Sequence, residues 1–286
     1  SNIDNIIATQ YSSLQSRARH AYCNNDYVKG YINQACINVV GHTGIKVQSK
    51  TSNEKINKTI ESSFRKWSKR NNCDVTGNLS LIDIQLLCVK GLLRDGEFFI
   101  FKNLSGSKLE LQLLDASKID VSYKDELSNQ RKVINGIEVN RFGKALAYYF
   151  LKDDNTRQRI PRDKMIHGFI QDFVGQKRGM SAVATALIRL GLLGQFETAA
   201  IDNARQSAKV MAFASKDIDD YPTHKSSYDE KDTEVTEVNF GEGASIPVLE
   251  SGLHIQKIDS QFPSSEYGNF KDAILRAVSL SLGYGI

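Results

Sequence analysis

The feature of this sequence that most constrains the fold is a long helical pattern that follows a basic turn bracketed by glycines. The turn reads Gly175-Gln-Lys-Arg-Gly-Met-Ser181, and the Ser181 side chain is predicted to cap the helix. Apolar residues then recur at spacings of three and four, which predicts one helix over residues 181–214. Such a helix spans on the order of 45 Å at about 1.5 Å per residue, more than a compact domain needs. We therefore expect it to pack against other copies of the chain.

A second face of this predicted helix is built from small residues. Small side chains allow a neighbouring backbone to approach closely, although each interior glycine costs roughly 1 kcal/mol of helix stability. We interpret these positions as candidates for packing between subunits: Gly191, Gly194, Ala200, Ala204 and Ala208.

The order of the predicted elements indicates an α+β fold. Residues 3–40, 53–70 and 79–93 are predicted to be helical, and in the second of these segments Ile56, Ile60, Phe64 and Trp67 are expected to face inward. Strand patterns follow, with Asn135-Gly136 as the turn of a hairpin. The strands are expected at residues 98–101, 109–114, 133–139, 145–151 and 165–169. Helices, then a β unit, then a long helix do not form the βαβ alternation of a parallel sheet.

Charge is distributed unevenly along the chain. Residues 1–110 contain 15 Lys or Arg and 9 Asp or Glu, whereas residues 216–239 contain 3 and 8. This pattern suggests different partners for the two regions, with a solvated surface as the alternative. The net charge of +4 is too small to establish a nucleic-acid-binding protein, and 41% hydrophobic residues exclude wholesale disorder.

The cysteines and the hydropathy argue against a disulfide scaffold and a membrane protein. The four cysteines at positions 23, 36, 73 and 88 are far apart and fit free thiols in a reducing compartment. The longest apolar stretch, 182–201, is interrupted by Arg189, Gln195 and Glu197. We therefore expect no membrane partner.

No motif supports catalysis, a metal site or a cofactor. The Gly175–Ser181 turn is one residue short of a P-loop and has no Lys after Gly179, and it lacks the last glycine of a nucleophile elbow. His167 could in principle assist Ser181, but a buried, hydrogen-bonded strand histidine is the favoured interpretation. The five histidines are dispersed and Asp217-Ile-Asp-Asp220 lacks the rest of a calcium loop. We expect no catalytic residue, no metal and no cofactor.

A series of short motifs, in order along the chain, resembles the portal proteins of lambda-type tailed phages and their prophage relatives. The N-terminal motifs are Arg17-Ala-Arg19, Asn24-Asn25, Asn38-Val-Val-Gly41, Gly44-Ile45, Trp67, Cys73-Asp74-x-x-Gly77 and Asp95-Gly-Glu97. The later motifs are Leu111-Gln-Leu113, Gly136–Val139, Ala147-Tyr148, Ile160-Pro161, Ile166-His167, Gly175–Ser181, Gly243–Leu249, Gly252, Pro263, Phe270, Leu275-Arg276 and Leu282-Gly283. One departure is Ser279, where the family usually has Ala.

The resemblance implies a structural portal, or head–tail connector, without enzymatic activity. Such a protein forms a ring, typically of twelve subunits, at one capsid vertex of the virion and is assembled in the cytoplasm of the bacterial host. Residues 1–174 would form the wing, 175–214 the first stem helix, 215–262 a small α/β clip and 263–286 the second stem helix. Family members continue beyond this point into a tunnel and crown region.

The resemblance also implies partners, and we predict from the charges which residues meet them. Double-stranded DNA would pass through the channel without sequence-specific contacts, beside the sparse cations Lys209, Lys271 and Arg276. The acidic clip is expected to dock the terminase large subunit and then a head-completion protein, through Asp217, Asp219, Asp220, Asp229, Glu230, Asp232 and Glu234. The capsid protein would surround the ring. Two alternatives remain: a phage assembly-associated protease or nuclease, and a non-ring DNA-binding module that uses the basic N-terminal helices.

Overall fold

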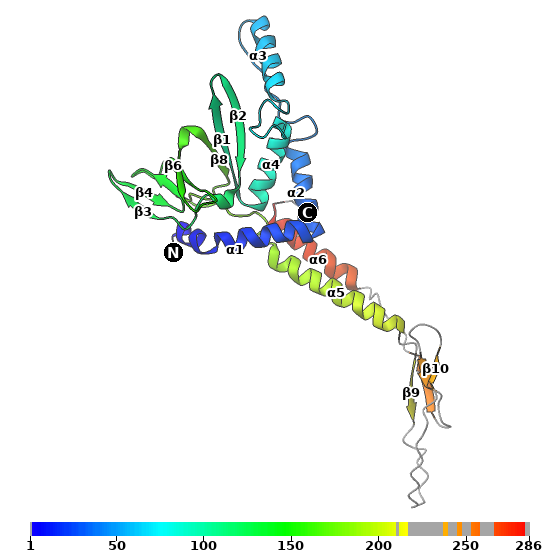
Figure 1. Ribbon diagram of the computed structural model, residues 1–286. Coiled ribbons are helices and arrows are strands. Elements are labelled where there is room, and N and C mark those ends of the chain that lie inside the picture. The colour runs from blue at the N-terminus through cyan, green and yellow to red at the C-terminus, as the bar shows by residue number, and fades with distance from the viewer. Residues whose placement is uncertain are drawn as a thin grey trace, which may run out of the picture. The chain divides into compact units, whose positions relative to one another are not determined.

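The computed structural model of the 286-residue chain describes residues 2–209, 212–216, 237–239, 245–247, 253–257 and 266–283 (Figure 1). The chain divides into two compact units, unit 1 (Ser1–Leu187) and unit 2 (Ile188–Ile286). In the part that the structure describes, unit 1 contains four helices and two sheets, and unit 2 contains two helices with short strand pairs between them in the sequence. This mixture of helices and antiparallel strands confirms the predicted α+β class.

The four N-terminal helices begin where polar side chains can accept hydrogen bonds from free backbone amides. Asn2 caps α1, Asn25 caps α2 and Asn53 caps α3, while Ser80 and Asp83 form a reciprocal capping box on α4. The predicted helical segments are therefore confirmed, with the first one divided in two at Asn25. The bounds are α1 Ile3–Asn24, α2 Asp26–Val39, α3 Glu54–Trp67 and α4 Leu81–Arg94.

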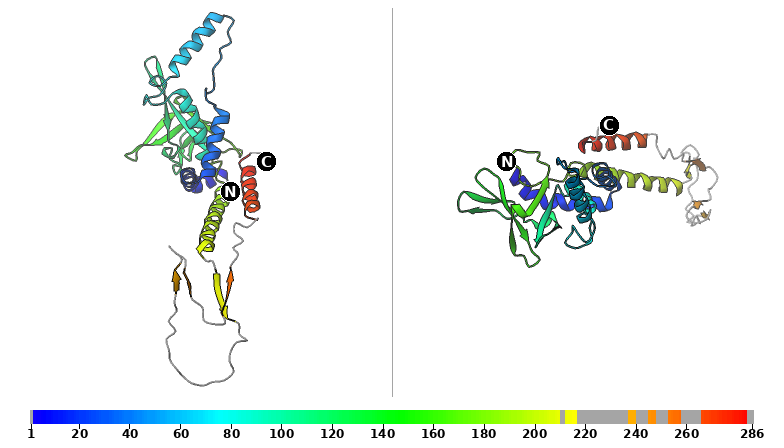
Figure 2. Two further views of the ribbon diagram at one scale, coloured as in Figure 1. Left: turned by 90° about the vertical axis from the view of Figure 1, so that its right-hand side faces the viewer. Right: turned by 90° about the horizontal axis from the view of Figure 1, so that it is seen from above.

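Helix α3 differs from the expectation in what it buries. None of its residues is buried, and the Ile56 and Ile60 side chains are 50% and 43% exposed. In Figure 1 and in the left view of Figure 2, α3 lies beyond the N-terminal end of α4. Its last residue, Trp67, is fixed by an indole hydrogen bond of 2.7 Å to the Leu109 carbonyl oxygen. The predicted inward face of α3 was therefore wrong over its first two turns, because the helix extends past the elements that could cover it.

Two antiparallel sheets follow the helices. The three-stranded sheet has the order β2-β1-β8, with β1 Glu97–Ser105, β2 Lys108–Leu114 and β8 Met165–Phe169. The five-stranded sheet runs in sequence order: β3 Asp125–Leu127, β4 Arg131–Ile134, β5 Ile137–Val139, β6 Ala145–Leu151 and β7 Arg157–Pro161. Short 3-10 turns, η1 Ala116–Lys118 and η2 Arg162–Lys164, connect the two sheets.

The predicted hairpin at Asn135-Gly136 is confirmed. Ile134 pairs with Ile137, and both turn residues have positive φ, 51° for Asn135 and 80° for Gly136, as a two-residue hairpin turn requires. A Cβ at Gly136 would lie 2.5 Å from the Asp120 carbonyl oxygen, so glycine is needed here for space as well as for conformation.

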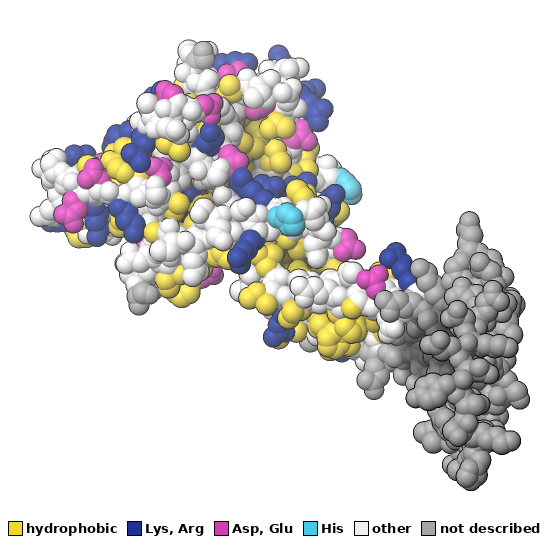
Figure 3. Space-filling model, turned by 60° about the horizontal axis from the view of Figure 1, so that its bottom comes forward, with side chains coloured by type: hydrophobic (Ala, Val, Ile, Leu, Met, Phe, Trp, Pro, Cys, Tyr) yellow, Lys and Arg dark blue, Asp and Glu magenta, His cyan; other side chains and the backbone are white. Residues whose placement is uncertain are grey.

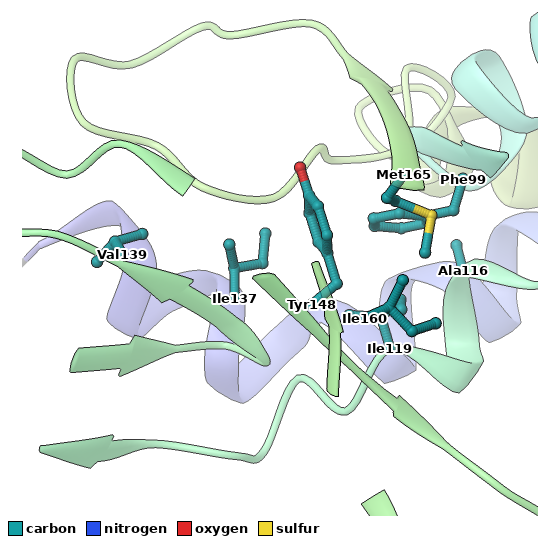
Figure 4. Packing of buried hydrophobic residues seen from close by; sticks show 8 residues of the cluster. All are labelled: Phe99, Ala116, Ile119, Ile137, Val139, Tyr148, Ile160 and Met165. Atoms are coloured by element: carbon teal, nitrogen blue, oxygen red, sulfur yellow. The ribbon is translucent and has the colours of Figure 1, made fainter. Parts of the chain in front are cut away.

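The main apolar core of unit 1 lies between the two sheets and the turn that joins them. Figure 4 shows its buried members, which come from both sheets and from the segment around η1. They are Phe99, Ala116, Ile119, Ile137, Val139, Tyr148, Ile160 and Met165. A second cluster joins α4 to β1 and β2 through Cys73, Ile84, Cys88, Ile100 and Leu111. The core thus places β1 at the centre of unit 1, in contact with α4 on one side and the five-stranded sheet on the other.

Unit 2 contains the helix α5, Leu187–Lys209, and the helix α6, Glu266–Ser281. Phe196 of α5 packs against the rings of Tyr267 and Phe270 at 5.6 and 4.5 Å between centroids. Glu197 of α5 forms an ion pair with Lys271 of α6, with 3.1 Å between Oε1 and Nζ. Short antiparallel strand pairs occur between the helices: β9 Ala212–Lys216 with β12 Leu253–Lys257, and β10 Glu237–Asn239 with β11 Ser245–Pro247.

The first long helix is shorter than predicted at both ends. Ser181 does not cap it, because the Ser181 hydroxyl donates a hydrogen bond of 3.3 Å to the Leu93 carbonyl oxygen. The Ala182 amide donates to the same oxygen at 3.0 Å, and residues 182–186 form successive turns with i to i+3 hydrogen bonds. These contacts hold the chain in a non-helical path, so α5 begins at Leu187. At the other end, residues 212–214 were expected to be helical and instead belong to the strand β9.

Candidate functional site

Three of the sequence motifs and Tyr11 meet at one buried polar cluster in unit 1, which we call the Glu97 cluster. It consists of Tyr11 from α1, Glu97 at the start of β1, His167 from β8, and Arg178 with Gly179 from the loop that leads towards α5. Glu97 and Arg178 are both essentially inaccessible to solvent. The cluster therefore joins the chain segment before α5 to the centre of unit 1.

The guanidinium group of Arg178 makes five contacts with acceptor oxygens. Nε and Nη2 lie 2.7 and 2.6 Å from Glu97 Oε1. Nη1 donates to the carbonyl oxygens of Ile119 at 3.2 Å and Asn135 at 2.9 Å, and Nη2 donates to that of Ala116 at 3.1 Å. A guanidinium carries five N–H groups, so the buried cation is fully paired. Arg178 thereby connects β1 of one sheet with the turns that carry the other.

Glu97 accepts hydrogen bonds on both carboxylate oxygens. Besides Arg178, Oε1 accepts from the Tyr11 hydroxyl, while Oε2 accepts from His167 Nε2 at 2.9 Å and from the Gly179 amide at 3.2 Å. Burial by itself raises the pKa of a carboxyl group, but the charge of Arg178 and the hydrogen bonds from His167 and Arg178 lower the pKa of Glu97 to about 2. Glu97 is therefore ionised throughout the physiological range.

His167 is a structural histidine, as the sequence favoured. Burial lowers its pKa below the usual value, so its ring is neutral at neutral pH, and Nε2 carries the proton because a carboxylate can only accept. The ring stacks on Phe99 at 4.2 Å and on Phe169 at 4.7 Å between centroids. Since His167 binds Glu97 and Ser181 binds Leu93, the structure gives the two residues separate partners rather than a nucleophile–base pair.

A second charged group fastens α1 beside this cluster. Arg19 donates to Asp95 at 2.8 Å and to Asp115 at 2.6 and 3.1 Å, and Arg94 also pairs with Asp95 at 2.7 Å. Burial raises the pKa of Asp115, but hydrogen bonds from Arg19 and Ser117 lower it to about 2. The motif Arg17-Ala-Arg19 thus acts through Arg19, which holds α1 against the turn that precedes β1.

Two glycines allow the loop before α5 to cross the turn before β1 in direct backbone contact. A Cβ on Gly96, which has φ of +91°, would lie 2.3 Å from the Met180 carbonyl carbon. A Cβ on Gly179 would lie 1.9 Å from the Gly96 carbonyl oxygen. Only glycine fits at both positions, which explains why Asp95-Gly-Glu97 and Gly175–Ser181 contain it.

The partnership of Arg178, Glu97 and Tyr11 was not predicted from the sequence. A signal was present for Glu97, because a carboxylate directly before the apolar run Phe98–Phe101 requires a cation if it is buried. The identity of that cation could not be found from the sequence, since Arg178 is 81 residues away in a turn that reads as solvated. The cluster is an internal joint rather than a reactive centre: its charges are matched and its donors are occupied.

The cluster makes unit 1 sensitive to acid. The folded pKa of Glu97 lies below its usual value of 4.5, so its contribution to stability is complete above pH 4.5 and is lost as the pH falls towards 2. The folded pKa of His167 lies below 6.5, so its contribution declines as the pH falls below 6.5. We expect the free energy of unfolding, measured with urea at pH 7, 5.5 and 4, to fall at each step. His167→Gln retains a donor but does not titrate, so its decline between pH 7 and 5.5 should be smaller, and an unchanged decline would contradict this assignment.

Two of the three candidate channel cations, Lys271 and Arg276, occupy different environments in unit 2, and the Lys209 side chain lies outside the described residues. Lys271 forms the ion pair with Glu197 described above, Arg276 is exposed on α6, and Lys209 is the last residue of α5. The structure therefore connects Lys271 with helix packing and leaves Arg276 accessible.

The candidate subunit-packing positions all belong to α5. A Cβ at Gly191 or Gly194 would meet no atom within 4 Å, and Ala204 is exposed, whereas Ala200 is already buried within the chain. Ala208 lies in α5, and its side chain is outside the described residues. Exposed apolar side chains accompany the open glycines, and Figure 3 shows hydrophobic side chains on this helical pair. They are Ile188, Leu192, Ile201, Phe270 and Leu280.

The acidic residues expected to dock the motor lie outside the described residues. These are Asp217, Asp219, Asp220, Asp229, Glu230, Asp232 and Glu234. Among the residues that the structure does describe, no group of three or more His, Cys, Asp or Glu side chains is placed to hold a metal ion. No described helix combines the length and the apolar character that a bilayer crossing requires.

Known structures with similar folds come from phage-like particles. The chain is similar to a protein in the neck of an empty GTA particle computed with C6 symmetry, at 13% identity and a TM-score of 0.56, covering 96% of this chain and 69% of that one. It is also similar to a chain of the virion of a native gene transfer agent (GTA) particle, at 14% identity and a TM-score of 0.57, covering 99% and 74%. The neck of the native particle computed with C12 symmetry matches at 14% identity and a TM-score of 0.55, covering 95% and 67%. At these identities the similarity establishes the fold.

Sequence comparison gives a family. The chain is 28% identical over 304 residues to a probable portal protein of Halomonas phage phiHAP-1, covering 98% of this chain and 58% of the relative. It therefore spans less than two thirds of the length of that relative. A family model described as phage portal protein, lambda family, matches residues 1–285, which confirms the resemblance drawn from the motifs. The chain belongs to the lambda family of phage portal proteins.

Proposed function

We propose that this chain is the body of a head–tail connector that forms a closed ring at one capsid vertex, through which double-stranded DNA enters and leaves. The family match over residues 1–285 carries this proposal. The necks with C6 and C12 symmetry that share the fold support a ring, with twelve subunits in the virion. The protein would act without enzymatic activity of its own and would be assembled in the cytoplasm of the bacterial host.

The surface of α5 supports contact between subunits. Ile188 and Leu192 are exposed and are one helical turn apart, so they lie on one face, and Gly191 between them leaves room for a neighbouring backbone. A ring closes through head-to-tail contacts in which each subunit uses two different faces. We assign this face of α5 to one side of the contact. Gly194 and Ala204 point to other sides of the helix and are proposed as further positions where a neighbouring subunit can approach closely.

Electron microscopy of the full-length protein tests the ring. Negative-stain images should show closed rings with a central opening. A monomer that binds DNA in a salt-dependent manner would instead favour the non-ring DNA-binding module. Cleavage of a capsid protein or of DNA by the purified protein would favour the assembly-associated enzyme.

The candidate channel cations give a prediction about DNA passage. DNA must slide, so each fixed contact with a phosphate adds grip and slows translocation. An exposed ion pair contributes about 0.2–1 kcal/mol, so Arg276→Glu is expected to change packaging rate or DNA retention roughly two- to fivefold. Lys271→Glu should act differently, because it also places two carboxylates together at Glu197 and loosens the pairing of α5 with α6. Lys209→Glu completes the series.

A packaging assay with purified terminase and DNA measures these effects. Arg70→Glu is the matched control, since Arg70 is an exposed cation that pairs with Asp83 in unit 1. Unchanged packaging and retention in all three variants would exclude these residues from the channel.

The acidic segment 217–237 is proposed to dock the terminase large subunit and, after packaging, a head-completion protein, while the capsid protein surrounds the ring. Its excess of carboxylates suits a basic partner surface. Deleting residues 219–236 should abolish co-purification of the terminase with the portal but leave ring formation intact. Retained binding of the terminase would place the docking site elsewhere.

A further inference from the structure

The loop that follows β8 presents apolar side chains to solvent on a rigid support. Val174 is 101% exposed and Phe173 is 49% exposed, and Ile170 nearby is also exposed. We call Ile170, Phe173 and Val174 the apolar tip. Exposed apolar groups clustered in this way are typical of a protein–protein contact.

The apolar tip is held in place by a buried glutamine. Gln176 is 2% exposed, and its Oε1 accepts from the backbone amides of Asp172 at 3.0 Å and Phe173 at 3.1 Å. Its Nε2 donates to the Arg178 carbonyl oxygen at 2.7 Å, which attaches the loop to the Glu97 cluster. Ordering the loop before binding lowers the entropic cost of association, so the tip is preorganised for docking.

A groove of complementary character lies elsewhere in unit 1. It has a volume of about 620 Å³ and lies between the extended segment 43–48, α3 and the start of α4. Ile45, Val47 and Phe64 supply apolar lining. The charged lining residues are the cations Lys46 and Arg65 and the carboxylate Glu61, whose Oε1 already accepts from the Ser49 amide at 3.1 Å. Two hydrogen bonds fix the walls: the Ile45 amide donates to Gln85 Oε1 at 2.9 Å, and Gln85 Nε2 donates to the Ile45 carbonyl oxygen at 3.3 Å. We call this cavity the α3 groove.

The tip and the groove cannot meet within one subunit. The tip loop is tied to the N-terminal end of α1, where the Lys177 amide donates to Asp4 Oδ1 at 3.2 Å. The groove is tied to α3 and to the N-terminal end of α4, and Figure 1 shows α3 well separated from the N-terminus. Each surface therefore needs a partner from outside its own unit 1.

We infer that the apolar tip of one subunit docks into the α3 groove of the next subunit in the ring. Head-to-tail closure requires two different and complementary patches on every copy, and these two patches satisfy that requirement. Phe173 and Val174 enter the apolar lining, and the exposed carboxylate of Asp172 meets Lys46 and Arg65. The inference rests on the ring proposed above and deepens it, because it names the contact between the wings.

Two cysteines test the contact directly in the full-length protein. Val47→Cys and Val174→Cys are introduced together into a background with Cys23→Ser, because Cys23 is the exposed native thiol in the described part of the chain. Each subunit then carries both halves, so oxidation should give a ladder of covalent dimers, trimers and larger products on a non-reducing gel. Each single-cysteine variant should stop at a dimer or give no product.

Charged substitutions provide the second measurement, which does not depend on the geometry of a disulfide. Val174→Asp and Val47→Asp each put a carboxylate into the docked surface and remove an apolar contact, so ring formation should require at least about tenfold more protein. Leu104→Asp is the matched control, since Leu104 is an exposed apolar residue on the β1–β2 hairpin outside both surfaces. All three positions are exposed, and their thermal unfolding should match the wild-type protein.

The outcomes separate this contact from the ring itself. If the wild-type protein forms rings and both valine variants form them at the same concentration, the contact is refuted and the ring stands. If oxidation yields only monomers although the wild-type protein forms rings, the contact is likewise refuted. If the wild-type protein forms no ring at any concentration, both the proposed ring and the proposed contact are refuted.

Discussion

Replacing Arg178 with methionine is expected to lower the free energy of unfolding by about 3–5 kcal/mol, the usual cost of removing one partner from a buried ion pair. Arg178 and Glu97 are both solvent-inaccessible, so water cannot replace the lost cation beside Glu97. The carbonyl oxygens of Ala116, Ile119 and Asn135 lose their donors in the same step. Urea denaturation of the 286-residue chain at pH 7 measures the effect.

Two further variants serve as controls for this experiment: a double substitution in the cluster and a substitution in a surface ion pair. Arg178→Met combined with Glu97→Gln removes both charges, so it should recover a part of the stability, on the order of 1–2 kcal/mol. Arg70→Met breaks the exposed pair with Asp83 and should cost less than about 1 kcal/mol. If Arg178→Met costs no more than Arg70→Met, the Glu97 cluster does not hold unit 1 together.

The second large effect is expected at the glycine crossing. Gly96→Ala adds a Cβ 2.3 Å from the Met180 carbonyl carbon in a residue with φ of +91°. A positive φ costs an L-residue roughly 1–2 kcal/mol, and overpacking a filled interior costs about 1–3 kcal/mol, so the sum is about 2–5 kcal/mol. Thermal and urea unfolding should both show it.

Two other glycines separate the conformational from the steric contribution. Gly106 has φ of +61° with open space around its Cβ position, so Gly106→Ala reports the conformational cost alone. Gly179 has no positive φ, but its Cβ would lie 1.9 Å from the Gly96 carbonyl oxygen, so Gly179→Ala reports the steric cost. Equal stability losses for Gly96→Ala and Gly106→Ala would show that the crossing is not tightly packed.

Local signals in the sequence were sufficient for most of the secondary structure. Asn25 and Ser80 precede helical patterns and do cap helices, and Asn135-Gly136 forms the predicted turn between paired strands. These features depend on residues close together in the chain, so a single sequence contains them. The family could also be predicted from the sequence, because its motifs are short and follow one another in a fixed order along the chain.

Features that depend on residues far apart in the chain could not be predicted from the sequence. The start of α5 is set by the bonds of Ser181 and Ala182 to Leu93, which is 88 residues from Ser181. Arg178 looks like a solvated turn residue until β1 and the turns at Ala116 and Asn135 surround it. The exposed face of α3 has the periodicity of a buried one, and periodicity cannot tell whether the covering surface belongs to the same chain or to a neighbour.

The anchoring of the loop before α5 has a mechanical consequence. Any tension applied along α5 reaches the rest of unit 1 through residues 175–186, where the Arg178 guanidinium donates hydrogen bonds to three separate segments. These are the start of β1 at Glu97, the η1 turn at Ala116 and Ile119, and the β4–β5 turn at Asn135. Pulling Arg178 out of the cluster would require several hydrogen bonds to break at the same time rather than one after another. A pulling force along α5 would therefore be distributed over β1, the η1 turn and the β4–β5 turn at once.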